Sequence, residues 1–170
     1  ARAAADALEV LLLQRPDDLA LGLERHVRHL VEQQRAAMRL LEQAGLNKLI
    51  PQLTQPFLGI CLGMQLLYES SAEADKRCLE VIEGRAHLLE KAPDRPVPHM
   101  GWNKLDIRRD VPLLHGIDQG SYFYFVHSYA VDVLSTTVAS ATYCRPCTAV
   151  VGQANFWGTQ FHPERSGEHG

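Results

Sequence analysis

The sequence has no excess of basic residues and no long apolar segment. Its 17 Lys and Arg residues stand against 20 Asp and Glu residues, giving a formal net charge of −3. Such a chain is a poor candidate for binding nucleic acid or an anionic membrane. Apolar runs such as Val10–Leu13 are far too short to span a membrane or to form a signal-peptide core. We therefore expect a cytoplasmic protein whose four cysteines stay reduced.

Internal repeats and low-complexity linkers are also absent from the 170 residues. This length suits a single domain that buries about two-thirds of its unfolded surface. Glycine is scarce at the start, where Gly22 is the only one before Gly45. Because the chain also lacks an initiating methionine, we expect a fragment or an unusual gene product.

Residues 57–67 combine a strand, a turn and a helix around one cysteine. Phe57–Ile60 is an apolar run that predicts a buried strand, and Met64–Glu69 predicts a helix with an apolar face. Cys61 lies between them in a Gly-x-Cys-x-Gly frame, the cysteine counterpart of the nucleophile elbow. In such a turn the backbone is strained, glycines leave room for close approach, and the helix N-terminus favours a thiolate. A small buried cysteine at a helix start is the structural alternative.

A second motif supplies the partners that a thiol nucleophile needs. An aromatic, strand-like run, Phe156–Phe161, ends at His162, and Glu164 follows two residues later. A thiol needs a base to accept its proton, and that base needs an anion to fix its tautomer. Cys61, His162 and Glu164 are therefore candidates for a catalytic triad.

Four stretches together resemble a known family: Gly-Ile-Cys-Leu-Gly-Met-Gln, Gln-Phe-His-Pro-Glu, Pro-His-Met-Gly-Trp-Asn (98–103) and Tyr-Phe-Tyr-Phe-Val-His-Ser-Tyr (122–129). They resemble the class I, triad-type glutamine amidotransferases. Within this family the chain is similar to the glutaminase subunits of imidazole glycerol phosphate synthase, which act in histidine biosynthesis. The resemblance covers residues 36–170, and residues 1–35 do not match.

The resemblance implies a function and a set of site residues. Glutamine would be hydrolysed to glutamate and ammonia by Cys61, His162 and Glu164, with the backbone N–H of Leu62 as an oxyanion donor. Ammonia would pass to a partner cyclase with a (β/α)8 barrel, giving a heterodimer with hydrolase and lyase activity and no cofactor or metal. The positions that match the glutamine-binding residues of the family are Gln65, Ser128 and Tyr129, and those that match its partner-facing region are Met100, Trp102, Asn103 and Arg165.

Residues 1–35 depart from the family pattern. Relatives begin with two strands, the second ending in a Pro-Gly-x-Gly turn that lines the oxyanion hole, and they end in a helix beyond the His-Pro-Glu motif. We find neither the strands nor the turn in residues 1–35, and the chain stops at Gly170. We therefore expect the fold and the thiol reactivity to be retained, and turnover of glutamine to be reduced.

The expected fold is α/β and three-layered, with a mostly parallel or mixed sheet flanked by helices. An amphipathic helix is predicted from Leu19 to about Gly45, and Ala36–Ile50 is helical by the family pattern. Residues 70–98 are predicted to be loop-like, with a strand near 81–84. Further strands are predicted at 105–107, 122–129 and 131–141, and a hairpin at 148–161.

Two patterns suggest metal or redox chemistry and have simpler interpretations. Cys144 and Cys147 have Cys-x-x-Cys spacing, but there is no second cysteine pair for zinc, and Pro146 indicates a turn followed by a strand. His26 and His29 are one helical turn apart among arginines, which is more typical of a solvated helix face.

Three other functions remain open on the sequence alone. The chain could serve another triad amidotransferase, although residues 98–103 argue against this. It could be a stand-alone cysteine hydrolase, although Gln65 and residues 124–129 argue against it. It could also be a catalytically impaired binding subunit, which the altered N-terminus favours.

Overall fold

We analysed a computed structural model, which describes residues 35–72, 76–92 and 94–170. The first described element is a helix over residues 35–43, followed by α3 (Leu46–Leu49) and the 3₁₀ helix η1 (Ile50–Gln52). Gly45 separates them with a φ of 71°, a left-handed conformation that glycine adopts readily. The helix predicted to end near Gly45 is confirmed over its described part. The described residues contain no helix with the length and apolarity needed to cross a membrane.

The largest sheet carries the two predicted motif strands side by side. Its order is β1 (Phe57–Ile60), β11 (Phe156–Thr159), β10 (Pro146–Gln153), β9 (Thr137–Thr142) and β6 (Asp106–Ile107). β1 and β11 run parallel with Ile60 opposite Thr159, and the remaining pairs are antiparallel. The predicted hairpin between β10 and β11 and the strand near 105–107 are confirmed.

Two smaller sheets complete the β structure. One has the order β3 (Lys76–Arg77), β2 (Tyr68–Ser71), β4 (Ile82–Leu88) and β8 (Tyr129–Val131). The other pairs β5 (His99–Lys104) with β7 (Tyr122–His127). The short helices are α4 (Leu62–Leu67), η2 (Pro112–Leu114), η3 (Pro163–Arg165) and η4 (Gly167–His169).

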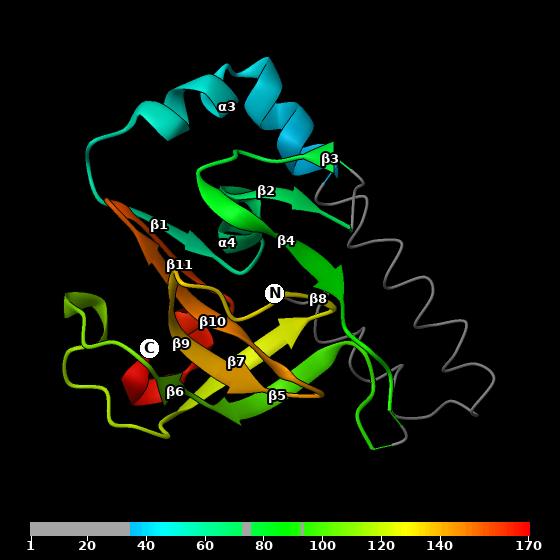
Figure 1. The fold of residues 1–170 in the computed structure, drawn as a ribbon, viewed down its shortest axis with the longest axis vertical. Coiled ribbons are helices and arrows are strands. Elements are labelled where there is room, and N and C mark those ends of the chain that lie inside the picture. The colour runs from blue at the N-terminus through cyan, green and yellow to red at the C-terminus, as the bar shows by residue number, and fades with distance from the viewer. Residues whose placement is uncertain (1–34, 73–75, 93) are drawn as a thin grey trace.

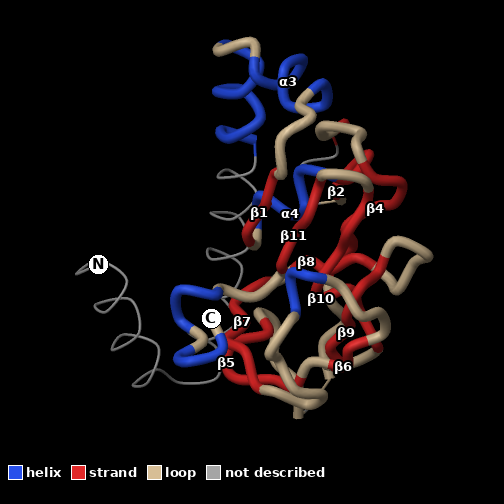
Figure 2. Tube along the Cα trace, turned by 90° about the vertical axis from the view of Figure 1, so that its left-hand side faces the viewer, coloured by secondary structure: helices blue, strands red, loops and turns tan. Residues whose placement is uncertain are grey.

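These elements form an α/β arrangement of mixed sheets and helices, which confirms the predicted fold class. The helix at residues 35–43 and α3 lie at one end of the molecule, and the β5–β7 sheet lies at the other (Figures 1 and 2). β1, α4 and β11 lie between these ends, so the two motifs meet in the middle of the molecule (Figure 1).

Four of the predicted element extents are wrong. The helix expected over Met64–Glu69 is α4, Leu62–Leu67, because Tyr68 already pairs with Ile82 as the start of β2. Residues 70–98 are less loop-like than expected, since β4 alternates buried and exposed side chains. The strand expected over 122–129 is interrupted at Ser128, and β7 and β8 belong to different sheets. The next strand, expected over 131–141, begins only at Thr137.

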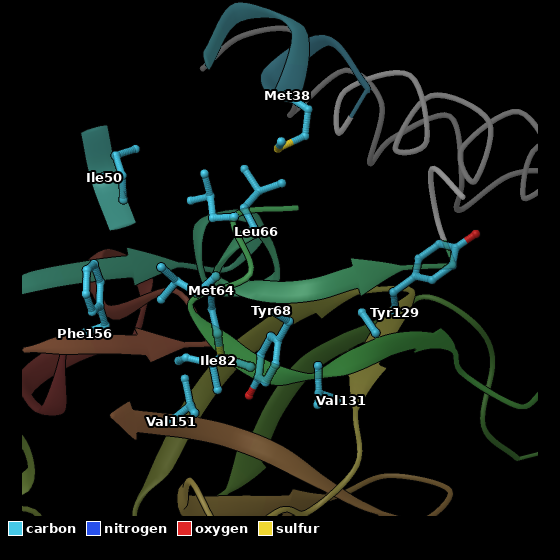
Figure 3. Close-up of a cluster of buried hydrophobic side chains, with 13 residues drawn as sticks. Met38, Ile50, Met64, Leu66, Tyr68, Ile82, Tyr129, Val131, Val151 and Phe156 are labelled. Atoms are coloured by element: carbon cyan, nitrogen blue, oxygen red, sulfur yellow. The ribbon is translucent and has the colours of Figure 1, made fainter. Parts of the chain in front are cut away.

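The main apolar core joins the helical end to the motif strands. Met38, from the helix at residues 35–43, lies over Leu66 of α4, and Met64 and Phe156 lie beneath it (Figure 3). Tyr68, which ends the α4 turn, is fully buried among these side chains. A second cluster, which includes Phe123, Phe125 and Phe161, packs β7 against the main sheet. Burial therefore fixes α4 on one side of the motif strands and β7 on the other.

Gly59 permits a close approach that no side chain would allow. A Cβ at Gly59 would lie 2.6 Å from the carbonyl carbon and oxygen of Gly63 and 2.8 Å from the nitrogen of Met64. We expect Gly59→Ala to lower the free energy of unfolding by about 1–3 kcal/mol, because these neighbours are backbone atoms. Urea titration would measure the change.

Gly63→Ala is the matched control for that substitution. In the described structure a Cβ at Gly63 meets nothing within 4 Å, so the expectation that this glycine leaves steric room is wrong. Gly63 lies inside α4, where alanine is the better helix former, so its substitution should be neutral or stabilising by up to about 1 kcal/mol. Equal losses in both variants would contradict the packing argument.

Candidate active site

Cys61 lies at the sharp turn between β1 and α4. It is the N-cap of α4 with φ 50° and ψ −103°, a positive φ that non-glycine residues rarely adopt. Two backbone hydrogen bonds fix the turn: the Cys61 N–H donates to the Thr159 carbonyl at 2.7 Å, and the Gln65 N–H donates to the Cys61 carbonyl at 3.2 Å. The predicted strained elbow is confirmed. Such a conformation costs on the order of 1–3 kcal/mol and is held by its surroundings.

The half-buried thiol has polar neighbours on two sides. The Cys61 Sγ donates to the Val126 carbonyl at 3.8 Å, and the Gln160 Nε2 donates to the Cys61 Sγ at 3.6 Å. The sulfur therefore lies between the end of β7 and the residue that follows β11.

His162 and Glu164 form the hydrogen-bonded pair that the sequence suggests. The His162 Nδ1 lies 2.7 Å from the Glu164 Oε1, a short distance typical of a charge-assisted bond. Slight burial would raise the pKa of Glu164, but the hydrogen bond from His162 and the neighbouring backbone and Arg165 hold it below its ordinary value. Because Glu164 is then a carboxylate that only accepts, Nδ1 carries the proton, and Nε2 remains for proton exchange.

β7 brings the thiol and the histidine to the same edge. The backbone N–H of His162 donates to the Tyr124 carbonyl at 2.9 Å, while the Cys61 thiol contacts the Val126 carbonyl. Carbonyls two residues apart on a strand point the same way and lie roughly 7 Å apart. The Cys61 thiol and the His162 backbone therefore lie along one stretch of β7.

The residues expected to bind glutamine are buried, and Gln65 is linked to the thiol through Gln160. The Gln65 Nε2 donates to the Tyr129 carbonyl and to the Gln160 Oε1, both at 3.0 Å. The Oγ of Ser128, in the part of the chain that the structure describes, is buried without a hydrogen-bond partner. Leu62, the expected oxyanion donor, is the first residue of α4, where helix geometry leaves N–H groups without intrahelical acceptors.

The expected partner-facing residues divide between the two faces of β5. Met100 and Trp102 are 41% and 55% exposed, and the Trp102 ring contacts the edge of the Tyr124 ring with centroids 6.0 Å apart. The Arg165 guanidinium lies over the same Tyr124 ring at 5.3 Å. Asn103 alternates to the other face, where its Nδ2 donates to the Thr142 carbonyl at 2.9 Å.

Neither a metal-holding cluster nor a disulfide is found among the described residues. None of the four cysteines forms a disulfide, and no cluster of His, Cys, Asp and Glu in the described ranges could hold a metal ion. Cys144 lies in a turn and Cys147 in β10, which confirms the turn-and-strand interpretation. Burial raises the pKa of Cys147 to about 11, which disfavours the thiolate at neutral pH. His26 and His29 lie outside the described residues.

Three polar residues near the site were not singled out from the sequence. Gln160 contacts the sulfur, and His99 and His127 form a buried pair in which Nδ1 of His99 lies 3.1 Å from Nε2 of His127. All three lie inside the motifs that carry the family resemblance. A buried polar side chain inside such a motif is the signal that could have found them.

The buried histidine pair should make the fold sensitive to acid. Burial lowers the pKa of His99 from its ordinary 6.5 to about 4, and burial with the neighbouring His99 and His162 lowers that of His127 to about 3. Between these values and 6.5 the unfolded chain binds more protons than the folded one. Stability is therefore fully present above pH 6.5 and falls as the pH drops towards 4, by up to about 1.4 kcal/mol per pH unit for each histidine.

Urea unfolding from pH 8 to pH 4 would measure this slope. His99→Phe keeps a ring between Phe125 and Tyr143 and removes one proton-binding group, so it should reduce the slope. His115→Asn, at an exposed position, should leave the slope unchanged. A pH-independent stability in the unaltered protein would contradict the prediction.

Comparison with known proteins agrees with this geometry. The family model described as glutamine amidotransferase class-I matches residues 39–170. The chain is 49% identical over 135 residues to imidazole glycerol phosphate synthase subunit HisH of Mannheimia succiniciproducens, covering 79% of this chain and 69% of the relative. It is 51% identical over 138 residues to subunit HisH of Pasteurella multocida, covering 80% and 68%.

A solved structure supports the same fold. A glutamine amidotransferase from Thermotoga maritima superposes with a TM-score of 0.53 at 20% identity, covering 74% of this chain and 47% of that one. The resemblance inferred from the sequence motifs is confirmed by the matched relatives. The chain belongs to the class-I glutamine amidotransferase family.

Proposed function

We propose that this chain is the glutaminase subunit of an imidazole glycerol phosphate synthase. It hydrolyses glutamine to glutamate and ammonia and delivers the ammonia to a cyclase subunit. The observation that carries the proposal is the strained Cys61 elbow beside the hydrogen-bonded His162–Glu164 pair, in a chain about half identical to HisH subunits. Glutamine is the substrate, and the cyclase is a (β/α)8 barrel with which the chain forms a heterodimer in the cytoplasm.

The chemistry follows from the roles of the triad. The Cys61 thiolate attacks the side-chain amide carbon of glutamine, and His162 Nε2 accepts the thiol proton and then gives a proton to the departing ammonia. Glu164 holds the proton on Nδ1 of His162 and stabilises the charged ring. Water then attacks the thioester, which releases glutamate and regenerates the thiol.

The oxyanion of the tetrahedral intermediate needs preorganised donors. The Leu62 N–H, at the start of α4 directly after the nucleophile, supplies one of them. The family's second donor belongs to the Pro-Gly-x-Gly turn; residues 1–35 contain no such sequence, and residues 1–34 lie outside the described residues. The reduced turnover expected from its absence stays a prediction, with a loss of about 10²–10³ in rate for one donor.

Glutamine binds beside the elbow, among Gln65, Ser128 and Tyr129. The Ser128 Oγ, which has no hydrogen-bond partner among the described residues, is available to the substrate, and the Gln65 amide nitrogen is committed to the Tyr129 carbonyl and to Gln160. Gln65 therefore contributes its carbonyl oxygen or its position rather than its amide hydrogens.

The cyclase docks on the exposed face of the β5–β7 sheet. Met100 and Trp102 of β5 are exposed there, beside Tyr124 and Arg165. The carbonyls of Tyr124 and Val126 bind His162 and Cys61, so the docking face and the site share β7. Ammonia released at Cys61 then has a short path to the partner. Asn103 supports this face from behind through its bond to the Thr142 carbonyl.

We expect Trp102→Ala to weaken binding of the cyclase at least tenfold, because large exposed aromatic side chains are frequent hot spots of interfaces. Isothermal titration calorimetry with the cyclase subunit would measure it. Leu113→Ala is a matched control, since Leu113 is also exposed but lies in η2 rather than on β5 or β7. Equal affinity in the Trp102 variant and the unaltered chain would place the interface elsewhere.

Glutamate release with and without the cyclase subunit tests the proposal as a whole. Glutamine hydrolysis that rises when the cyclase is added, together with formation of imidazole glycerol phosphate, would support it. Hydrolysis that is indifferent to the cyclase would favour a stand-alone hydrolase. Binding of the cyclase without any hydrolysis would favour a catalytically impaired subunit.

A further inference from the structure

Gln160 holds a fixed position between the nucleophile and the substrate-binding residues. It follows β11 directly and is only 1% exposed. Its Oε1 accepts from the Gln65 Nε2 at 3.0 Å, and its Nε2 donates to the Cys61 Sγ at 3.6 Å. The orientation of the amide follows from its neighbours. The Gln65 Nε2 also donates to the Tyr129 carbonyl, which can only accept, so the Gln160 oxygen must face Gln65 and its N–H must face the sulfur.

The same Tyr129 carbonyl is the end of a second chain of hydrogen bonds. It accepts from the His127 Nδ1 at 2.8 Å, which leaves the His127 Nε2 as an acceptor. This Nε2 lies 3.1 Å from the His99 Nδ1, so His99 donates from Nδ1. The His99 Nε2 then accepts from the Asn103 Nδ2 at 3.4 Å. In this series of hydrogen bonds, from Asn103 on β5 to the Tyr129 carbonyl, each donor therefore points towards Tyr129.

This order requires both histidines to be neutral. A protonated histidine donates from both ring nitrogens, so charging either one would set two N–H groups against each other or against the Asn103 amide. Burial lowers the pKa of His99 to about 4 and that of His127 to about 3. At neutral pH the chain of hydrogen bonds is therefore held in one arrangement, which fixes the Tyr129 carbonyl, the Gln65 amide bonded to it and, through Gln65, the Gln160 amide.

A carbonyl acceptor and an amide donor both contact the sulfur, and they favour different protonation states of it. The Val126 carbonyl accepts the S–H of the thiol, and it has no bond to offer once that proton leaves. The Gln160 N–H donates to sulfur, and a bond of this kind is stronger to an anion than to a neutral thiol. The two contacts thus act in opposite directions on the thiol–thiolate equilibrium.

We propose that Gln160 is a positioning residue for the Cys61 sulfur, and that its N–H, oriented through Gln65 and the Tyr129 carbonyl, favours the thiolate and directs it towards the substrate. This role rests on the proposed function of Cys61 as the nucleophile. Under this proposal Gln160 contributes to the reaction as well as filling the core. The His99–His127 pair then holds the Tyr129 carbonyl in place.

The test is the pH profile of Cys61 alkylation in the full chain. Iodoacetamide is the probe, and peptide mass spectrometry reports each cysteine separately. Gln160→Met keeps the length of the side chain and removes the donor, and it should lower the Cys61 alkylation rate at pH 7 about tenfold and move its profile to higher pH. Gln153→Met is the matched control, because Gln153 donates to the Val81 carbonyl at an exposed position. It should leave the profile unchanged.

A measurement on the unaltered side chain keeps the test valid if Gln160→Met does not fold. In protein with nitrogen-15 labelled glutamine, the Gln160 side-chain N–H signal should shift as Cys61 titrates, and Cys61→Ser should abolish that shift. An unchanged alkylation profile in a folded Gln160→Met variant would overturn the proposal, as would a Gln160 signal indifferent to Cys61. Failure of the proposed function would be separate, since Cys61 of the unaltered chain would then not react with a glutamine analogue.

Discussion

Replacing Cys61 with serine is expected to reduce glutamine hydrolysis in the cyclase complex by about 10⁴-fold or more, the order of loss seen when a nucleophile is removed. Serine fits the same elbow, so the positive φ and the hydrogen bond to the Thr159 carbonyl should be retained. A hydroxyl, however, is far harder to deprotonate than a thiol, and the proposed mechanism needs a thiolate. Steady-state glutamate release would measure the loss.

Cys78→Ser is the control for the Cys61 variant. Cys78 is half-buried like Cys61, but it packs at the edge of the apolar core that contains Leu66 and Tyr68. Its substitution should leave glutamate release within about twofold of the unaltered chain, because Cys78 packs against apolar core side chains rather than in the elbow. If the Cys61 variant kept a comparable rate, the nucleophile would have to be another group.

The second large effect is expected from His162→Asn, with a loss of about 10⁴-fold or more in kcat. Asparagine can still bond Glu164, but it cannot accept the thiol proton or return it to ammonia. Glutamate release in the cyclase complex would again measure the loss. His115→Asn, at an exposed position beside Asp110, should leave the rate unchanged. A kcat within tenfold of the unaltered chain would show that another base serves Cys61.

The His162 variant should also change thiol reactivity in a direction that a folding defect would not. His162 is the proposed proton acceptor for the Cys61 thiol, so its loss should move the pH profile of Cys61 alkylation to higher pH. Alkylation of Cys78 in the same sample should keep its profile. A loss of folding would instead expose all four cysteines together.

The site could be predicted from the sequence where its geometry is local. The elbow depends on Gly59, on Cys61 and on an apolar strand that runs directly into a helix, and all of this is contained in eleven residues. The His162–Glu164 pair is likewise separated by only two positions. The β10–β11 hairpin was predictable because its turn and its apolar strands are adjacent in the chain.

Features that depend on distant partners were not predictable in this way. Tyr68 continues the helical pattern of α4 by sequence, yet parallel pairing with β4 and full burial make it the first residue of a strand. Asn103 belongs to a motif expected to face the partner, yet strand alternation turns its amide to the Thr142 carbonyl. Gln160 contacts a sulfur 99 positions away, and only the pairing of β1 with β11 brings the two together.

The most direct test is selective labelling with a diazo-oxo amino acid, a glutamine analogue that alkylates the nucleophile of a glutamine site. The intact chain would be treated in the cyclase complex, and the adduct located by peptide mass spectrometry. We predict one adduct, on Cys61, with Cys78, Cys144 and Cys147 unmodified, and protection when excess glutamine is present. Equal modification of all four cysteines, or an adduct on any residue other than Cys61, would contradict the assignment of Cys61 as the nucleophile.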